Sequence, residues 1–192
     1  MKLYYAPGAC SMASHIALIE SGVDFEAVKV DLRAHRTEQG EDFYAISPRG
    51  YVPAVETGFG LLTENPAVLT WIADETGTQP AGEAFYRQLE WLGFIGTEIH
   101  GGYHPLFGGD SEDRQAAAKE GLGKKYRLAA DLMAGRDWLV SDTAGVADNY
   151  LFVTLLWANK FGVELPAELA AFFKRNLARP AVQEAMKREG LG

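Results

Sequence analysis

The spacing of apolar positions divides the chain into two parts with different periodicity. In the first ~75 residues, short apolar segments with strand character alternate with helical ones. Strands are expected at 2–5, 25–30, 52–55 and 60–63, and helices at 11–21 and 65–74. The last two strands are separated by a few residues that include Gly58, which predicts a hairpin. The pattern is typical of a small α/β unit, with a loop and an irregular helix expected over 33–43.

Beyond residue 82 the apolar spacing is helical throughout. Helices are expected over 83–103, 111–133, 147–161, 166–177 and 180–188. The Thr-, Gly- and Pro-containing stretch from Thr76 to Gly82 reads as a linker. The sequence therefore predicts an α/β domain over 1–76, a linker over 77–82 and an all-helical domain over 83–192.

Composition and charge narrow the class of protein. Hydrophobic residues make up 47% of the chain and charged residues 23%, as in ordinary globular proteins. A net charge of −8 argues against nucleic acid or an anionic membrane as a partner. No apolar run approaches the ~20 residues that span a bilayer, and the first residues lack the apolar core of a secretory signal. One cysteine cannot form an intrachain disulfide, so a cytoplasmic location is expected.

That single cysteine, Cys10, follows a strand and a Pro-Gly turn and precedes a helix. The positive end of a helix favours a thiolate, so a lowered pKa and thiol chemistry are one interpretation. The other is a small buried hydrophobe without a chemical role. Ser11 beside it either caps the helix or stabilises a neighbouring thiolate.

Two further segments could contact a ligand. A cis Val52-Pro53 bond would turn backbone groups outward, but only ~5% of X–Pro bonds are cis, so an edge-strand proline in trans is favoured by the residues alone. Glu64 precedes Asn65, the expected N-cap, and Pro66, the expected first helical residue. A carboxylate beside a helix N-terminus suits an α-amino acid group, although an ordinary helix start has the same composition.

His100 and His104 are spaced to share a helix face, but a convincing third ligand is missing. We therefore expect no metal site at this pair.

Several motifs taken together are similar to those of a known family. They are Tyr5–Ser11, Tyr51–Ala54, Leu62–Glu64, Glu98–His100 and Val146–Asp148. In this order they resemble a bacterial cytosolic glutathione S-transferase, most closely the beta class. The resemblance implies a thioredoxin-like N-terminal domain, an all-helical C-terminal domain and a homodimer.

The resemblance also implies where glutathione binds. Pro53 would be cis, and the backbone of Val52 would pair with the cysteinyl part of glutathione. Glu64 and Asn65 would hold the γ-glutamyl end. His35 and Tyr51 stand where the family has a Lys and a Gln near the rest of the peptide.

For catalysis, the resemblance implies that Cys10 faces the glutathione sulfur with Ser11 and His100 nearby. The electrophile would bind between the domains near His100, Tyr103 and His104. Thiolate stabilisation by such groups would make glutathione nucleophilic near neutral pH.

The chain also departs from the family pattern. Gly93 and Gly101 stand where an Asn and a Lys are expected, and Asn65 stands where Ser or Gly is usual. Several side-chain anchors for glutathione are therefore lost at His35, Tyr51, Gly93 and Gly101, whereas Asn65 can still cap the helix and donate to a carboxylate.

The function expected from these features is conjugation of glutathione, as co-substrate and without a resident cofactor, to a small hydrophobic electrophile in detoxification. Two alternatives stay open. One is thiol–disulfide or peroxide chemistry at Cys10. The other is a non-catalytic binding or regulatory protein on the same fold.

Overall fold

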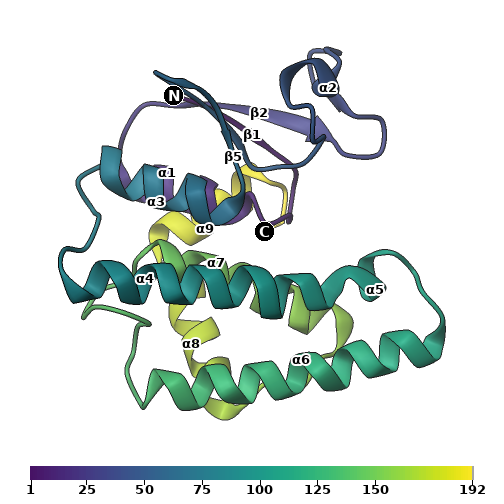
Figure 1. Ribbon diagram of the computed structural model, residues 1–192, viewed down its shortest axis with the longest axis vertical. Helices are drawn as coiled ribbons and strands as arrows, with labels where there is room; N and C mark the ends of the chain where they lie inside the picture. Colours follow the sequence, from purple (N-terminus) through teal and green to yellow (C-terminus); the bar gives the residue numbers. More distant parts are fainter. Residues whose placement is uncertain (192) are drawn as a thin grey trace. The chain divides into compact units, whose positions relative to one another are not determined.

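The computed structural model describes residues 1–191, and the chain forms two compact units (Figure 1). The first contains Met1–Pro80 together with the chain from Arg179 onward, and the second is Ala81–Ala178. The expected helical domain of 83–192 thus extends too far at its C-terminal end. The last helix belongs with the first unit because it packs against the first helix.

A mixed sheet forms the centre of the first unit. Its strands are β1 (Lys2–Tyr5), β2 (Glu26–Asp31), β3 (Arg36–Thr37), β4 (Ala54–Thr57) and β5 (Gly60–Thr63). They lie in the order β3-β2-β1-β4-β5, and β1 pairs parallel with β2 while the other pairs are antiparallel. The hairpin of β4 and β5 is confirmed, with Thr57 opposite Gly60 at its turn.

Helices cover both faces of this sheet. They are α1 (Met12–Ser21), α2 (Phe43–Ile46), α3 (Asn65–Glu75) and α9 (Pro180–Arg188). α1 and α3 lie side by side, and α9 packs on α1 (Figure 1). On the other face, Phe43 of α2 is fully buried against Tyr4, Val28 and Val30 of the strands. Alternation along β1, β2 and β4 thus gives the sheet apolar side chains for both faces.

Two details of the first unit differ from the sequence prediction. The two-residue β3 lies in the polar stretch expected to be a loop, where backbone pairing with β2 rather than apolar periodicity defines the strand. Asn65 is the first residue of α3, and the N-cap is Glu64. Pro66 therefore follows the first helical residue, still within the turn whose N–H groups have no helical partner.

The second unit is built of helices only, as far as residues 81–178 are concerned. They are α4 (Glu83–Phe94), η1 (Ile95–Ile99), η2 (His100–Tyr103), α5 (His104–Phe107), α6 (Glu112–Met133), α7 (Val146–Phe161) and α8 (Ala167–Leu177). The single helix expected over 83–103 is therefore interrupted, since η1 is a π-helix and η2 a 3-10 helix. The change from π to 3-10 hydrogen bonding falls at His100, beside Gly101 and Gly102, and glycine has low helix propensity.

α7 contributes more buried residues to the second unit than any of its other helices. Twelve of its residues are buried, including Tyr150, Phe152 and Trp157. Asp148 accepts hydrogen bonds from the Leu139 and Gly145 N–H groups, which fixes the start of the helix.

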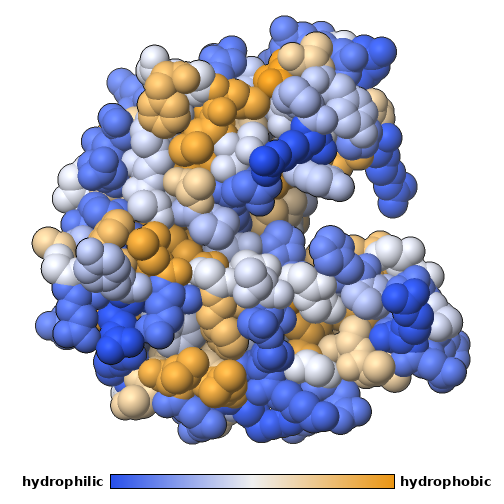
Figure 2. All heavy atoms as spheres, in the orientation of Figure 1, coloured by the Kyte–Doolittle hydropathy of each residue, from blue (hydrophilic) through white to orange (hydrophobic). Residues whose placement is uncertain are grey.

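On the face drawn in Figure 2, hydrophilic and hydrophobic residues are interspersed. Across residues 1–191, none of the helices combines the length and the apolar character needed to cross a membrane.

Candidate functional site

The loop between β1 and α1 is held in shape by Ser11. The Ala6 N–H donates to Ser11 Oγ at 3.1 Å, and the Ser11 hydroxyl donates to the Ala6 carbonyl at 3.4 Å. Ser11 is fully buried and its side chain does not cap α1. Its hydroxyl is thus used within the loop, which corrects the expectation that it caps the helix.

Cys10 lies next in this loop and is partly exposed. Its thiol donates to the Val52 carbonyl, with 3.2 Å between Sγ and O. Desolvation raises the pKa of the thiol to about 12, although hydrogen bonds from the backbone of Cys10 and Ser11 act in the opposite direction. The expected lowering of this pKa is therefore wrong, because desolvation outweighs the backbone hydrogen bonds to the sulfur.

The Val52-Pro53 peptide bond is cis, as the family resemblance implies and against the trans form favoured by frequency alone. Val52 is buried, and its carbonyl accepts the Cys10 thiol. The loop after β1 and the segment before β4 thereby meet at one place. Tyr51 is 71% exposed and free to contact a ligand.

Glu64 precedes α3 in an uncommon backbone conformation. Its φ of +70° lies in the left-handed region, where residues other than glycine are rare. Its carboxylate is 62% exposed and forms an ion pair with Arg49, whose side chain comes from the turn before β4. Such conformations persist where the surrounding structure holds them, often at functional sites. Arg49 was not among the residues singled out from the sequence.

Asn65 has a different environment from the one expected. It is only 5% exposed. Its Nδ2 donates to the Cys10 carbonyl at 3.0 Å, and its Oδ1 accepts from Ser14 Oγ at 3.4 Å. The side chain thus ties the start of α3 to the start of α1.

His35 is also engaged within the protein. Its ring stacks on Tyr44 with centroids 4.2 Å apart, and Nε2 lies 3.1 Å from the Tyr44 hydroxyl. A Cβ on Gly50 would lie 2.6 Å from the Tyr44 ring and 3.0 Å from His35 Nδ1, so only glycine fits against this pair. The position where the family has a Lys is therefore occupied by a packed aromatic pair.

In the second unit, His100 is held by aromatic neighbours from α7. Its Nδ1 lies 2.7 Å from the Tyr150 hydroxyl, and its ring packs on Trp157 with centroids 4.9 Å apart. His100 keeps partial exposure. Tyr150 and Trp157 fix its orientation, and their spacing of seven residues on a buried helix is the sequence signal that could have pointed to them.

Tyr103 and His104 do not form a pair facing a common ligand. Tyr103 is fully buried, and its hydroxyl contacts the Tyr126 hydroxyl at 2.8 Å and donates to the Thr154 carbonyl at 3.1 Å. Burial raises the pKa of Tyr103, and Tyr126 adds to this rise. Tyr103 is therefore a core residue, which corrects its expected place in an electrophile pocket. His104 is exposed at the start of α5.

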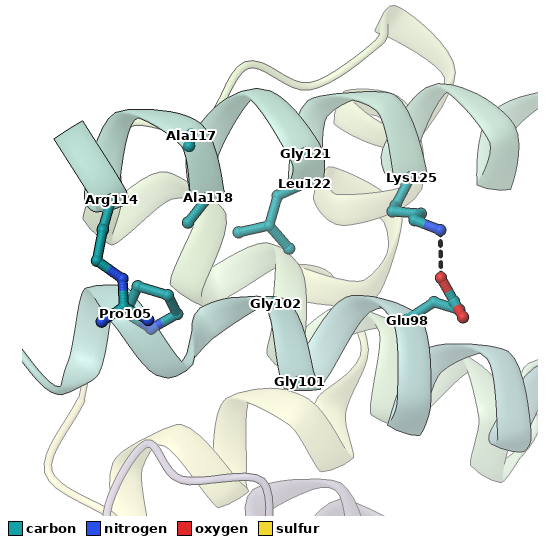
Figure 3. Close-up of a pocket in the computed structure, with 10 residues that line it drawn as sticks. All are labelled: Glu98, Gly101, Gly102, Pro105, Arg114, Ala117, Ala118, Gly121, Leu122 and Lys125. Carbon is teal, nitrogen blue, oxygen red and sulfur yellow. Dashed lines mark hydrogen bonds and ion pairs between the residues drawn. The ribbon is translucent and has the colours of Figure 1, made fainter. Parts of the chain in front are cut away.

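The second unit also contains a surface hollow of about 420 Å³ between α6 and the segment from η1 to α5 (Figure 3). Small side chains form most of its lining, and the ion pair of Glu98 and Lys125 lies at one end. It contains none of the residues expected to bind glutathione or to act in catalysis. Its lining offers no nucleophile and no convergent set of polar groups, so its chemistry does not indicate the active site.

Within residues 1–191, no group of three or more His, Cys, Asp or Glu side chains is placed to hold a metal ion.

Comparison with known proteins gives the family. The model of the glutathione S-transferase N-terminal domain matches residues 1–74, and that of the C-terminal domain matches residues 88–180. Glutathione S-transferase GstA of Escherichia coli O157:H7 is 41% identical over 200 residues, covering 100% of both chains. The chain belongs to the glutathione S-transferase family.

Solved structures agree with this membership. A sphingomonad glutathione S-transferase complexed with glutathione is 45% identical, with a TM-score of 0.93 and 100% coverage of both chains. A bacterial beta class glutathione S-transferase from Sphingomonas chungbukensis is 39% identical, with the same TM-score and coverage. The resemblance to the bacterial beta class, the thioredoxin-like N-terminal fold and the helical C-terminal fold are thus confirmed. The protein is a glutathione transferase.

Proposed function

We propose that this glutathione transferase conjugates glutathione to a small hydrophobic electrophile. The glutathione thiol would lose its proton to solvent, and the thiolate would form a new C–S bond to the electrophilic carbon. In a substitution, the leaving group departs with the electron pair of the bond that breaks. The protein's part is to bind the peptide and to stabilise the thiolate electrostatically.

The contact between the Cys10 thiol and the Val52 carbonyl is the observation that supports this placement most directly. It puts the cysteine of the β1–α1 loop against the backbone that would pair with the cysteinyl part of glutathione. Glu64, exposed at the start of α3, supplies a carboxylate for the γ-glutamyl ammonium. Tyr51 extends the binding surface through its exposed ring.

In this proposal Cys10 acts as a neutral thiol, whose single S–H turns from the Val52 carbonyl to the glutathione sulfur when glutathione binds. A pKa of about 12 keeps it protonated near neutral pH, which disfavours attack by its own thiolate. The alternative of thiol–disulfide or peroxide chemistry at Cys10 is therefore less favoured. Replacing Cys10 by Ala separates the two, since conjugation should persist within about tenfold, whereas thiol transfer through Cys10 would be abolished.

Four further assignments rest on the family resemblance. His100 would assist the reaction, with its ring oriented by Tyr150 and Trp157. The active form would be a homodimer, and the role would be detoxification. The cytoplasm is the compartment that suits a chain with a single cysteine.

Calorimetric titration of the reduced protein with glutathione at neutral pH tests the proposal first. Saturable binding in the micromolar to low-millimolar range is expected, followed by thioether formation with a nitro-activated aryl halide. Absence of both heat and thermal stabilisation at high glutathione would contradict the proposal. It would favour a protein that keeps the fold without binding glutathione, consistent with the packed His35 and the glycines at 93 and 101.

A further inference from the structure

The γ-glutamyl end of glutathione carries an ammonium and a carboxylate on the same carbon, so a site for it needs one group for each charge. Glu64 can serve the ammonium. The side chain expected to serve the carboxylate, Asn65, is buried and bonded to Cys10 and Ser14. Pro66, the next residue of α3, has no N–H to offer. The start of α3 therefore offers fewer side-chain donors for a carboxylate than the sequence suggests.

Arg49 is the cation that the structure places at this point. Its Nη1 donates to Glu64 Oε1, and its side chain is 61% exposed, so the guanidinium is open to a ligand as well. An arginine has five N–H donors in a planar fork and binds carboxylates in two-point fashion. Because one nitrogen of the guanidinium contacts Glu64, its other N–H groups can donate to a second carboxylate.

We propose that Arg49 is a specificity-determining residue that binds the γ-glutamyl α-carboxylate of glutathione. With Glu64 it forms a pair of opposite charges that matches the α-amino acid group of the ligand: the guanidinium meets the carboxylate, and the Glu64 carboxylate meets the ammonium. The inference rests on the proposed function, because it names a residue that selects the co-substrate.

Backbone hydrogen bonds hold the Arg49–Glu64 pair in place without a ligand. Arg49 lies in a turn closed by a hydrogen bond of 2.8 Å from the Gly50 N–H to the Ser47 carbonyl. Glu64 is fixed by its left-handed backbone and by the bond from the Val68 N–H to its own carbonyl at 2.9 Å. Both backbones are held before a ligand arrives, which lowers the entropy lost on binding. Because both side chains are exposed, their attraction to a ligand should weaken as salt screens the charges.

The test compares two ligands on two variants. The ligands are glutathione and 4-aminobutanoyl-Cys-Gly, which keeps the ammonium and lacks the α-carboxylate. Wild-type protein should bind glutathione about tenfold more tightly than the analogue. Arg49→Gln should bind glutathione about tenfold more weakly than wild type and bind the analogue with unchanged affinity. The rate at saturating glutathione should stay unchanged, so the effect appears in KM.

Two controls make this specific. Arg49→Lys keeps the positive charge and should recover most of the affinity for glutathione. Arg188→Gln removes an exposed arginine of the same unit that pairs with Glu184 on α9, and it should bind both ligands as wild type does.

The outcomes separate this inference from the proposed function. If Arg49→Gln binds both ligands as wild type does, or loses affinity for both equally, Arg49 does not recognise the carboxylate and only the inference fails. If wild-type protein binds no glutathione, the proposed function and the inference fail together.

Discussion

The state of the Cys10 thiol results from two opposing effects at the start of α1. Backbone hydrogen bonds and the helix terminus favour a thiolate, whereas removal of the sulfur from water favours the neutral thiol. Desolvation is the larger effect here, and the Val52 carbonyl accepts a bond that only a protonated thiol can donate.

Alkylation of Cys10 measures this balance without interference, because the chain has no other cysteine. We expect slow reaction of the free protein with iodoacetamide at pH 7, because a pKa of about 12 leaves very little thiolate there. The rate should rise about tenfold for each pH unit up to pH 10, as the thiolate fraction does below the pKa. Mass spectrometry of quenched samples gives the rate, and a plateau above pH 8 would contradict the raised pKa.

Ser11 acts through the loop and gives a second residue-level prediction. Ser11→Ala removes both hydrogen bonds to Ala6. The buried N–H and carbonyl of Ala6 then lack these partners. We expect a loss of about 2 kcal/mol in the free energy of unfolding, measured with urea. Ser111→Ala is the matched control, since that exposed N-cap serine makes no side-chain capping bond. Equal effects of the two substitutions would argue against this role of Ser11.

At these positions the sequence predicts which residues come together better than it predicts their contacts. The family resemblance implies that Cys10, Val52 and Glu64 surround one ligand. In the first unit, Cys10 contacts the Val52 carbonyl, and Asn65, the residue after Glu64, donates to the Cys10 carbonyl. The orientation of Ser11, the burial of Asn65 and the packing of His35 on Tyr44 depend on neighbours distant in sequence. Arg49 was missed because a basic residue in a polar turn has no periodicity to distinguish it.

At the level of elements, the segment after α4 shows where helix periodicity stops being informative. Apolar spacing runs continuously from 83 to 103, yet hydrogen bonding changes to π and then 3-10 geometry. Within the 3-10 segment, a Cβ on Gly102 would lie 2.9 Å from Cδ2 and 3.3 Å from Cγ of Leu122. Leu122 is only 1% exposed and has little room to move. The absence of a side chain at 102 lets η2 approach α6 closely.

The adjacent glycines of η2 form a matched pair for testing this. Gly102→Ala should lower the free energy of unfolding by about 1–2 kcal/mol, because the added methyl overpacks against Leu122. Gly101→Ala should leave it unchanged or raise it slightly, since the nearest atom to its Cβ would be 4.0 Å away and alanine restricts the unfolded chain. Urea denaturation of both variants measures the difference. Equal stability of the two would show that the approach of η2 to α6 does not depend on Gly102.

Element types were otherwise well predicted where apolar periodicity is strong, as in α8 and α9. The prediction was weakest where an element depends on backbone pairing with another strand rather than on a pattern of apolar residues. β3 exists because its backbone meets β2, and its polar residues carry no strand signal. The N-cap of α3 is Glu64 rather than Asn65, whose side chain instead bonds to Ser14 of α1.

On the scale of the whole molecule, the first unit is assembled from both ends of the chain. Glu189, just beyond α9, is bonded to the opening segment: its carboxylate accepts from the Gly8 N–H at 2.8 Å and lies 2.9 Å from His15 Nδ1. The side chains of His15 and Glu189 are both fully buried. Arg179, the residue before α9, pairs with Glu20 near the C-terminal end of α1. Because Gly8 lies in the loop that carries Cys10, the C-terminal segment also supports the candidate site.

Removing the Glu189 carboxylate should therefore destabilise the fold more than removing an exposed carboxylate of α9. Glu189→Ala leaves buried His15 without this partner and removes the acceptor of the Gly8 N–H, so we expect a loss of about 3 kcal/mol in the free energy of unfolding. Glu184→Ala is the control, because that carboxylate is exposed and pairs only along α9 with Arg188, which predicts a change of at most about 0.5 kcal/mol. Hydrogen exchange of Glu189→Ala should show faster exchange in β1 and α1 than in α6 and α7, because the lost contacts lie in the first unit. A uniform increase across both units would mean that the C-terminal segment stabilises the whole chain rather than the unit it joins.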